Sequence, residues 1–130
     1  MNHAMEVKIY YEDTDCGNVV YYANYLRYME RARTEYMGDR GASVKELMDQ
    51  GTLFIIARVE IDYRSSARYG EVLVVETWVP ETTGATITFQ HRMKEKATGR
   101  LITESKAIAV CVDAVGKPKR VPWDVLEKLR

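Results

Sequence analysis

The sequence has little that would support metal or redox chemistry. It contains two cysteines and two histidines in 130 residues. Neither a Cys-x-x-Cys nor a His-x-x-x-His spacing occurs, so a zinc site would have too few ligands. Cys16 and Cys111 lie far apart, and we interpret them as free thiols of a cytoplasmic protein. We therefore expect neither a bound metal nor a separate cofactor.

Net charge and long apolar runs are also absent. Nineteen Lys and Arg residues balance nineteen Asp and Glu residues, which gives a formal charge of zero. No broad basic surface is therefore expected to attract nucleic acid or an acidic membrane. No apolar leader is evident, and no apolar run is long enough to span a bilayer. A chain with so little net charge permits self-association, because its copies repel each other weakly.

Repeats, low-complexity tracts and Pro/Gly-rich linkers are missing as well. Only three prolines interrupt the 130 residues, which indicates a single domain over residues 1–130. A chain of this length buries roughly two-thirds of its unfolded surface around one core. We expect one principal site per chain, unless subunits share sites.

A helical pattern follows residue 21. Bulky apolar residues recur there at the i, i+3, i+4, i+7 spacing of a helix with one apolar face. They are Tyr22, Tyr25, Leu26, Met29, Ala32, Tyr36 and Met37. Gly38 is predicted to end this helix in the left-handed conformation. Ser43 and Glu46 form a capping box for a second, short helix that stops near Gly51.

The strand pattern has a period of two. The first strand is expected over residues 5–11, and long β-branched segments follow. These segments are residues 53–64, 71–80, 85–96 and 100–113. Short links between them favour hairpins and an antiparallel sheet.

Small residues occupy one face of the last strand, which would let a helix lie close to the sheet. They are Ser105, Ala107, Ala109 and Cys111. The order of elements predicts an α+β domain in which a curved antiparallel sheet of about five strands wraps around one long helix. A terminal helix is expected over residues 123–129, with Trp123, Leu126 and Leu129 facing protein. One sheet edge would stay uncovered in a monomer, which favours a dimer.

Three acids precede the long helix: Glu12, Asp13 and Asp15. Unpaired amides and the positive end of a helix dipole favour developing negative charge there. Hydrolysis of a thioester needs donors for the carbonyl oxygen and a group that attacks the carbon or activates water. Asp15 could be that group. Acids before a helix also serve as N-caps, and Gly17 fits a turn, so the pattern alone leaves a structural role open.

A resemblance to a known family narrows these alternatives. The residues that carry it are Tyr11-Glu12-Asp13-Thr14-Asp15-x-Gly17, Val19-Val20-Tyr21, Ala23-Asn24-Tyr25-Leu26 and Glu30-Arg31-Ala32-Arg33-Thr34-Glu35. They resemble the signature of the 4-hydroxybenzoyl-CoA thioesterase family, and most closely its YbgC-type acyl-CoA thioesterases. The segment IDYRSSARYGEVLVVET extends the resemblance toward the whole chain. It implies a hotdog fold, a homodimer or a tetramer of paired dimers, and metal-free hydrolysis of acyl-CoA to free acid and CoA.

The resemblance also implies roles for individual residues. Asp15 aligns with the catalytic nucleophile or general base, and Tyr11 with a tyrosine that lines the site. The helix N-terminal amide near Tyr22 matches the group that polarises the thioester carbonyl. Substrate contacts are expected from Gly17, Val20, Asn24, Tyr25, Arg68 and Arg92. The two arginines are expected from their charge and their place at the predicted rim of the sheet, and not from the resemblance, because positive side chains suit the phosphates of CoA.

One position departs from the YbgC pattern. Those proteins usually carry His where this chain has Tyr22. Tyrosine has a reference pKa of about 10, against about 6.5 for histidine, so it is a poorer proton shuttle near neutral pH. Tyrosine here resembles the hydroxybenzoyl-CoA branch, in which an aspartate and the helix-end amide suffice. Aliphatic and aromatic acyl groups both stay open.

Two other functions remain as alternatives. The first is a non-catalytic hotdog module that binds acyl-CoA or acyl-carrier protein. The second and more distant one is a hydratase or dehydratase, which some hotdog relatives are. That chemistry needs a paired acid and base, usually with a histidine on the helix and its adjoining loop. His3 and His91 lie in neither place.

Overall fold

The computed structural model describes residues 3–130, and one antiparallel sheet forms its framework. The strands are β1 (His3–Lys8), β2 (Leu53–Tyr63), β3 (Val72–Thr82), β4 (Thr86–Glu95) and β5 (Leu101–Val112). Their order in the sheet is β1-β3-β4-β5-β2. The helices are α1 (Asn24–Asp39), α2 (Val44–Asp49) and α3 (Trp123–Leu129), and a 3-10 turn η1 spans Tyr11–Asp13. Within this described part of the chain, no helix is long and apolar enough to cross a membrane.

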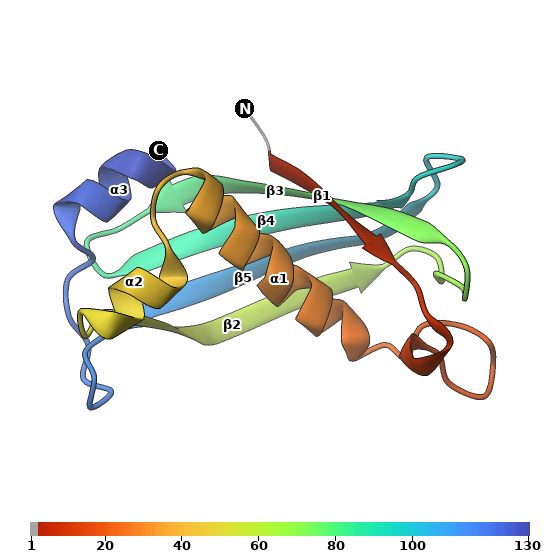
Figure 1. Cartoon of the computed structure of the whole chain (residues 1–130), viewed down its shortest axis with the longest axis horizontal. Coiled ribbons are helices and arrows are strands. Elements are labelled where there is room, and N and C mark those ends of the chain that lie inside the picture. Colours follow the sequence, from red (N-terminus) through yellow and green to blue (C-terminus); the bar gives the residue numbers. More distant parts are fainter. Residues whose placement is uncertain (1–2) are drawn as a thin grey trace.

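Helix α1 lies diagonally across one face of the sheet (Figure 1). Ala32 of α1 and Ala107 of β5 are both 0 % exposed and belong to the same core cluster. The small side chains expected on β5 are therefore buried beneath the helix layer, as their pattern predicted. The five-stranded antiparallel sheet with one long helix in its concave face confirms the hotdog fold.

The apolar face of α1 is rotated slightly from the predicted one. Tyr28 is 1 % exposed and belongs to the core, although the periodicity had not included it. Tyr22 and Leu26, which the pattern placed on the buried face, are 63 % and 42 % exposed. Tyr22 precedes the helix, which begins at Asn24.

Two predicted ends differ from the observed ones. Gly38 lies inside α1, and the left-handed conformation falls at Gly41, with φ of 82°. The first strand ends at Lys8, before the expected residue 11. Its alternation continues to Ile9, but the Ile9 amide donates to the carbonyl of Glu71 in the loop before β3.

The two short helices follow their local signals. Ser43 caps α2 by accepting the amide of Glu46, which is the serine half of the predicted capping box. Helix α3 has the predicted bounds and buries Leu126 and Leu129. Trp123 was expected to face protein and does not, since it is 66 % exposed at the first position of the helix.

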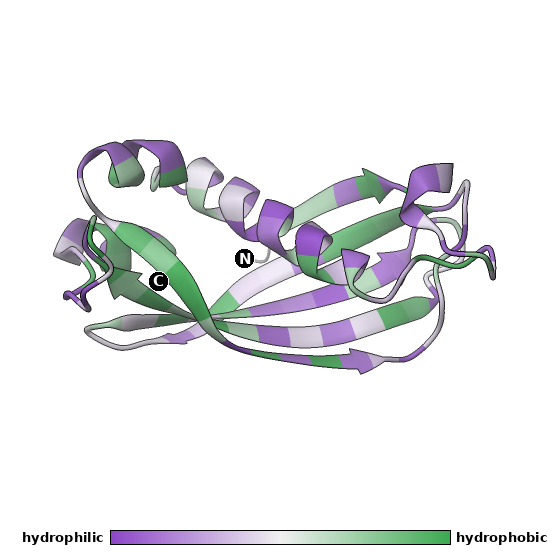
Figure 2. Ribbon diagram, turned by 90° about the horizontal axis from the view of Figure 1, so that it is seen from below, coloured by the Kyte–Doolittle hydropathy of each residue, from purple (hydrophilic) through white to green (hydrophobic). Residues whose placement is uncertain are grey.

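The loop between β1 and α1 lies at one end of the molecule, and α2 and α3 lie at the other end (Figure 1). Strand β2 forms one edge of the sheet. In the view of Figure 2, α1 covers one side of the sheet and the first half of β2 is apolar.

Candidate active site

A tight turn holds Asp15 in the loop between β1 and α1. One carboxylate oxygen, Oδ1, accepts the amide of Gly17 at 2.8 Å. The turn closes where the Asp15 amide donates to the carbonyl of Val19 at 3.0 Å, and Asn18 within it has a positive φ of 60°. A Cβ at position 17 would lie 3.3 Å from Oδ1. Glycine thus gives its amide close access to the carboxylate, and Asp15 itself is exposed.

Short bridges fix this turn to the rest of the chain. Thr14 pairs with Val20, and Val19 pairs with Arg68 of the loop before β3. The Val20 amide donates to the carbonyl of Ala67 at 2.8 Å. The Val20 side chain, expected to contact substrate, is 4 % exposed and belongs to the core. The buried Val20 side chain therefore attaches the loop to the core.

Helix α1 begins beside this turn without a capping side chain. Its N-cap is Ala23, and its first turn contains no acid. Among the described residues, the amides of Tyr22 and Ala23 have no backbone acceptor. The capping role that the sequence left open therefore does not apply to α1. The start of the helix offers free N–H donors and the positive end of its dipole.

The other two acids have different surroundings from Asp15. Asp13 accepts the amide of Tyr10 through Oδ2 at 2.8 Å. Its backbone carbonyl accepts both the amide of Tyr21 and the side-chain amide of Asn24. Asn24, one of the expected substrate contacts, thus joins the helix to the loop. Glu12 is exposed in η1.

Tyrosines surround the loop and the helix start. The rings of Tyr21 and Tyr22 lie 4.8 Å apart, and those of Tyr11 and Tyr69 lie 5.9 Å apart edge to face. The Tyr63 hydroxyl donates to the carbonyl of Tyr22 at 3.1 Å. The sequence reasoning named Tyr11 and Tyr22 but missed the other three. The richness of the chain in tyrosine, nine residues, was the available signal.

Electrostatic coupling indicates that Asp15 lies near this aromatic group. The pKa of Tyr21 is raised, first by a hydrogen bond with the Tyr22 side chain and last by the negative charge of Asp15. The Tyr21 phenol, with its raised pKa, can donate a hydrogen bond.

Of the remaining predicted substrate contacts, Tyr25 lies in the core, and the two arginines lie on different surfaces. Tyr25 is 3 % exposed, and its hydroxyl accepts the amide of Ala67, so it packs within the core. Arg68 is exposed beside Val19. Arg92 lies on the sheet face opposite the buried His91, where it stacks over Trp78 at 5.4 Å and pairs with Glu104. The two arginines are not brought together.

Comparison with known proteins supports the family suggested by the sequence. The family model described as the thioesterase-like superfamily matches residues 10–129. The acyl-CoA thioesterase YbgC of Haemophilus influenzae is 40 % identical over 118 residues, which cover 90 % of this chain and 85 % of that protein. The acyl-CoA thioester hydrolase YbgC of Escherichia coli is 33 % identical over 125 residues, covering 95 % and 92 %.

Solved structures share the fold. A 4-hydroxybenzoyl-CoA thioesterase in complex with 4-hydroxybenzoyl-CoA superposes with a TM-score of 0.91 at 22 % identity, covering 99 % of each chain. A DHNA-CoA thioesterase of Staphylococcus aureus gives a TM-score of 0.88 at 26 % identity, covering 92 % of this chain and 80 % of that one. On these matches and on its hotdog fold, the chain belongs to the thioesterase-like superfamily.

Proposed function

We propose that this protein hydrolyses acyl-CoA thioesters to a free acid and CoA, with Asp15 as the nucleophile or general base. The observation that carries the proposal is the position of Asp15. Its carboxylate is fixed by the Gly17 amide in a turn beside the uncapped start of α1. The curated relatives named above act on acyl-CoA and match nearly the whole chain.

The free amides near Tyr22 supply the electrophilic part of the mechanism. An N–H donor that binds the thioester oxygen stabilises the negative charge that develops there when the carbon is attacked. Removal of one such donor typically slows a reaction of this kind by about 100-fold to 1,000-fold.

Asp15 supplies the attack in one of two ways. As a nucleophile, its oxygen adds to the carbonyl carbon, the C–S bond breaks, and a mixed anhydride forms that water then hydrolyses. As a general base, it takes a proton from water while the water oxygen adds to the carbon. CoA leaves as a thiolate in both routes. A thiol has a pKa of about 8.5, so the leaving group needs no strong acid.

The tyrosines and Arg68 would serve the two ends of the substrate. Tyr11 and Tyr22 expose their rings beside the loop and would form walls for the acyl group. Arg68, exposed and bridged to Val19, is suited to a phosphate at the mouth of the site. Arg92 is less suited, because it already pairs with Glu104 on the other side of the sheet.

A homodimer is part of the proposal. Strand β2 is a sheet edge, and it exposes Ile55, Ile56 and Val59. Between β2 and α1 runs a hollow of about 340 Å³ lined by Leu26, Met29 and Arg33 as well as Ile56 and Val59. A free, apolar strand edge is a template for pairing with another chain. A second copy there would also enclose the exposed Asp15 end of α1, and paired dimers could form a tetramer.

The location of the protein is likewise a proposal. Cys16 and Cys111 are free, which suits a reducing compartment such as the cytoplasm.

Asp15→Asn tests the function. We expect turnover in a thiol-release assay to fall by about 100-fold or more, because the amide can neither attack nor accept a proton efficiently. The substrates would be acyl-CoAs of increasing chain length together with benzoyl-CoA and hydroxybenzoyl-CoA. Glu12→Gln is the matched control, since Glu12 is an exposed acid three residues away, and it should retain activity.

Two results would count against the proposal. Unchanged turnover by Asp15→Asn would exclude this carboxylate as the catalytic group. Saturable binding of CoA esters without hydrolysis by the wild-type protein would favour the alternative of a non-catalytic acyl-CoA or acyl-carrier-protein binding module.

A further inference from the structure

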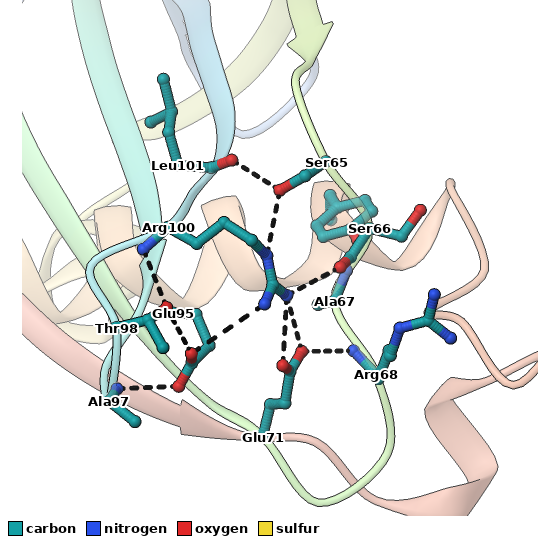
Figure 3. Close-up of polar contacts among 11 residues, drawn as sticks. Ser65, Ser66, Ala67, Arg68, Glu71, Glu95, Ala97, Thr98, Arg100 and Leu101 are labelled. Carbon is teal, nitrogen blue, oxygen red and sulfur yellow. Dashed lines mark hydrogen bonds and ion pairs between the residues drawn. The ribbon is translucent and has the colours of Figure 1, made fainter.

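Arg100 joins chain segments that are far apart in the sequence. It lies in the turn before β5, and its guanidinium points into the loop of residues 64–71 (Figure 3). Nη2 donates to both carboxylate oxygens of Glu71, at 3.0 and 3.1 Å, and to the carbonyl of Ser66 at 2.9 Å. Nε donates to Oγ of Ser65 at 3.3 Å. A guanidinium suits this task because its donors form a rigid, planar fork.

The partners of Arg100 are themselves held in place. Oε1 of Glu71 also accepts the amide of Arg68 at 2.7 Å. Oγ of Ser65 donates to the carbonyl of Leu101 at 2.6 Å. Glu95, 6 % exposed, contributes a weaker ion pair to Arg100 at 4.0 Å. Hydrogen bonds therefore hold the loop at Ser65, at Arg68 and at Glu71 (Figure 3).

The loop of residues 64–71 also contacts the segment that contains Asp15. Ala67 accepts the amide of Val20, and its own amide donates to the Tyr25 hydroxyl in the first turn of α1. Arg68 pairs with Val19, whose carbonyl accepts the amide of Asp15. Hydrogen bonds and the short stretches of backbone between them therefore connect Arg100 through the loop to the backbone of Asp15.

We infer that Arg100 is a positioning residue for Asp15, acting through Glu71 and the loop of residues 64–71. It does not touch the reacting atoms. It holds the loop that sets the distance between the carboxylate and the free amides at the start of α1. This inference rests on the proposed function, since it assigns to Arg100 the placement of the catalytic acid.

Arg100→Lys is the principal test, because it keeps the positive charge and removes the fork. We expect kcat to fall about 10-fold to 100-fold with KM changed less than about twofold, since a displacement of about 1 Å can cost this much. The amide of Val20, bonded to Ala67, should exchange its hydrogen faster, while amides within the β4–β5 pairing should not.

Arg64→Lys is the matched control. Arg64 also lies in this loop region, but its side chain is 53 % exposed and pairs with Glu104 at 3.5 Å. It should leave kcat and the exchange of Val20 unchanged. Glu71→Gln should reproduce the loss seen in Arg100→Lys, and the double variant should be no worse than the poorer single variant, because the two residues act as one unit.

The results for the two variants distinguish failure of the positioning role of Arg100 from failure of the proposed thioesterase function. If Asp15→Asn is inactive while Arg100→Lys keeps a wild-type kcat, the positioning role is overturned and the proposed function stands. The same holds if Arg100→Lys lowers only the melting temperature. If Asp15→Asn keeps its turnover, the proposed function fails, and the positioning role fails with it.

Discussion

His91 is a buried imidazole without a catalytic role in this site. It lies on β4 at 1 % exposure, and its Nδ1 is 3.0 Å from the hydroxyl of Thr77. Its Nε2 is buried and has no partner among the described residues. Burial, and secondarily the charge of Arg33, lower its pKa to about 3. The sequence placed His91 outside the long helix and its adjoining loop, and its buried position on β4 agrees with that placement.

This pKa predicts an acid sensitivity of the fold. The unfolded chain binds a proton at His91 below about pH 6.5, but the folded chain does not until about pH 3. Above pH 6.5 neither state is protonated at His91, so His91 does not lower the free energy of unfolding there. As the pH falls below 6.5, the free energy of unfolding decreases by up to about 1.4 kcal/mol per pH unit, because only the unfolded chain takes up the proton.

His91→Gln should flatten the pH dependence of the free energy of unfolding between about pH 6 and pH 4. Urea unfolding followed at several pH values would measure it. His3→Gln removes the other histidine of the chain and should keep the steeper slope. Parallel curves for wild type and His91→Gln would contradict the assignment of the acid sensitivity to this residue.

At the scale of elements, the core between α1 and the sheet contains small residues of β5. Ala107 and Ala109 are 0 % and 2 % exposed on the inner face of β5. A larger side chain at Ala107 must displace its neighbours in the core cluster, which includes Ala32 of α1, because protein interiors are close-packed.

Ala107→Leu should therefore destabilise the protein by about 1–3 kcal/mol. Thermal or urea unfolding would measure the loss. Ile108→Leu on the opposite face of the same strand is the control, since Ile108 is only half-buried and the change conserves volume. An unchanged free energy of unfolding for Ala107→Leu would contradict close packing around Ala107.

The sequence predicted the types of these elements well and some of their ends poorly. Periodicity identified α1 and all five strands, including β2, which has no fully buried residue in the single chain. It could not show that Ile9 leaves β1 to bond with Glu71, nor that α1 continues through Gly38 to a left-handed Gly41. The Ile9 bond depends on a partner distant in the sequence, whereas the end of α1 is closed by local bonds such as that from the Ala42 amide to the Met37 carbonyl.

The candidate site was predicted in part. Asp15, Gly17 and Asn24 belong to one local stretch, so the motif brings them together. Tyr63 and Tyr69 reach the site from the end of β2 and the loop before β3, and only the folded chain shows their proximity. Val20 and Tyr25 have motif positions but lie in the core, which a motif cannot distinguish from substrate contact.

At the scale of the whole molecule, the edge strand β2 governs the proposed assembly. Ile56 lines the hollow between β2 and α1 described above. It also lines a second hollow of about 310 Å³ along α1, together with Phe54 and Phe89, and it is 41 % exposed. A charge introduced there would be buried without a partner in a dimer, which strongly opposes association.

Ile56→Lys should shift the protein from dimer to monomer and lower thioester hydrolysis in parallel. Analytical ultracentrifugation with activity assays on the same samples would measure both. Val115→Lys is the control, because Val115 is an apolar residue 80 % exposed in the turn after β5. A wild-type protein that sediments as a monomer at full activity would refute the proposed pairing.

The strand order has a consequence for the timing of synthesis. Strand β1 pairs only with β3, and β2 pairs only with β5. A ribosome must therefore release most of the chain before either sheet edge can form, and contacts between such distant segments are slow to assemble. The nascent polypeptide carries its acidic loop from the outset, but the residues that hold that loop, Ala67, Glu71 and Arg100, are synthesised later. A product terminated before them would bear the motif without these contacts.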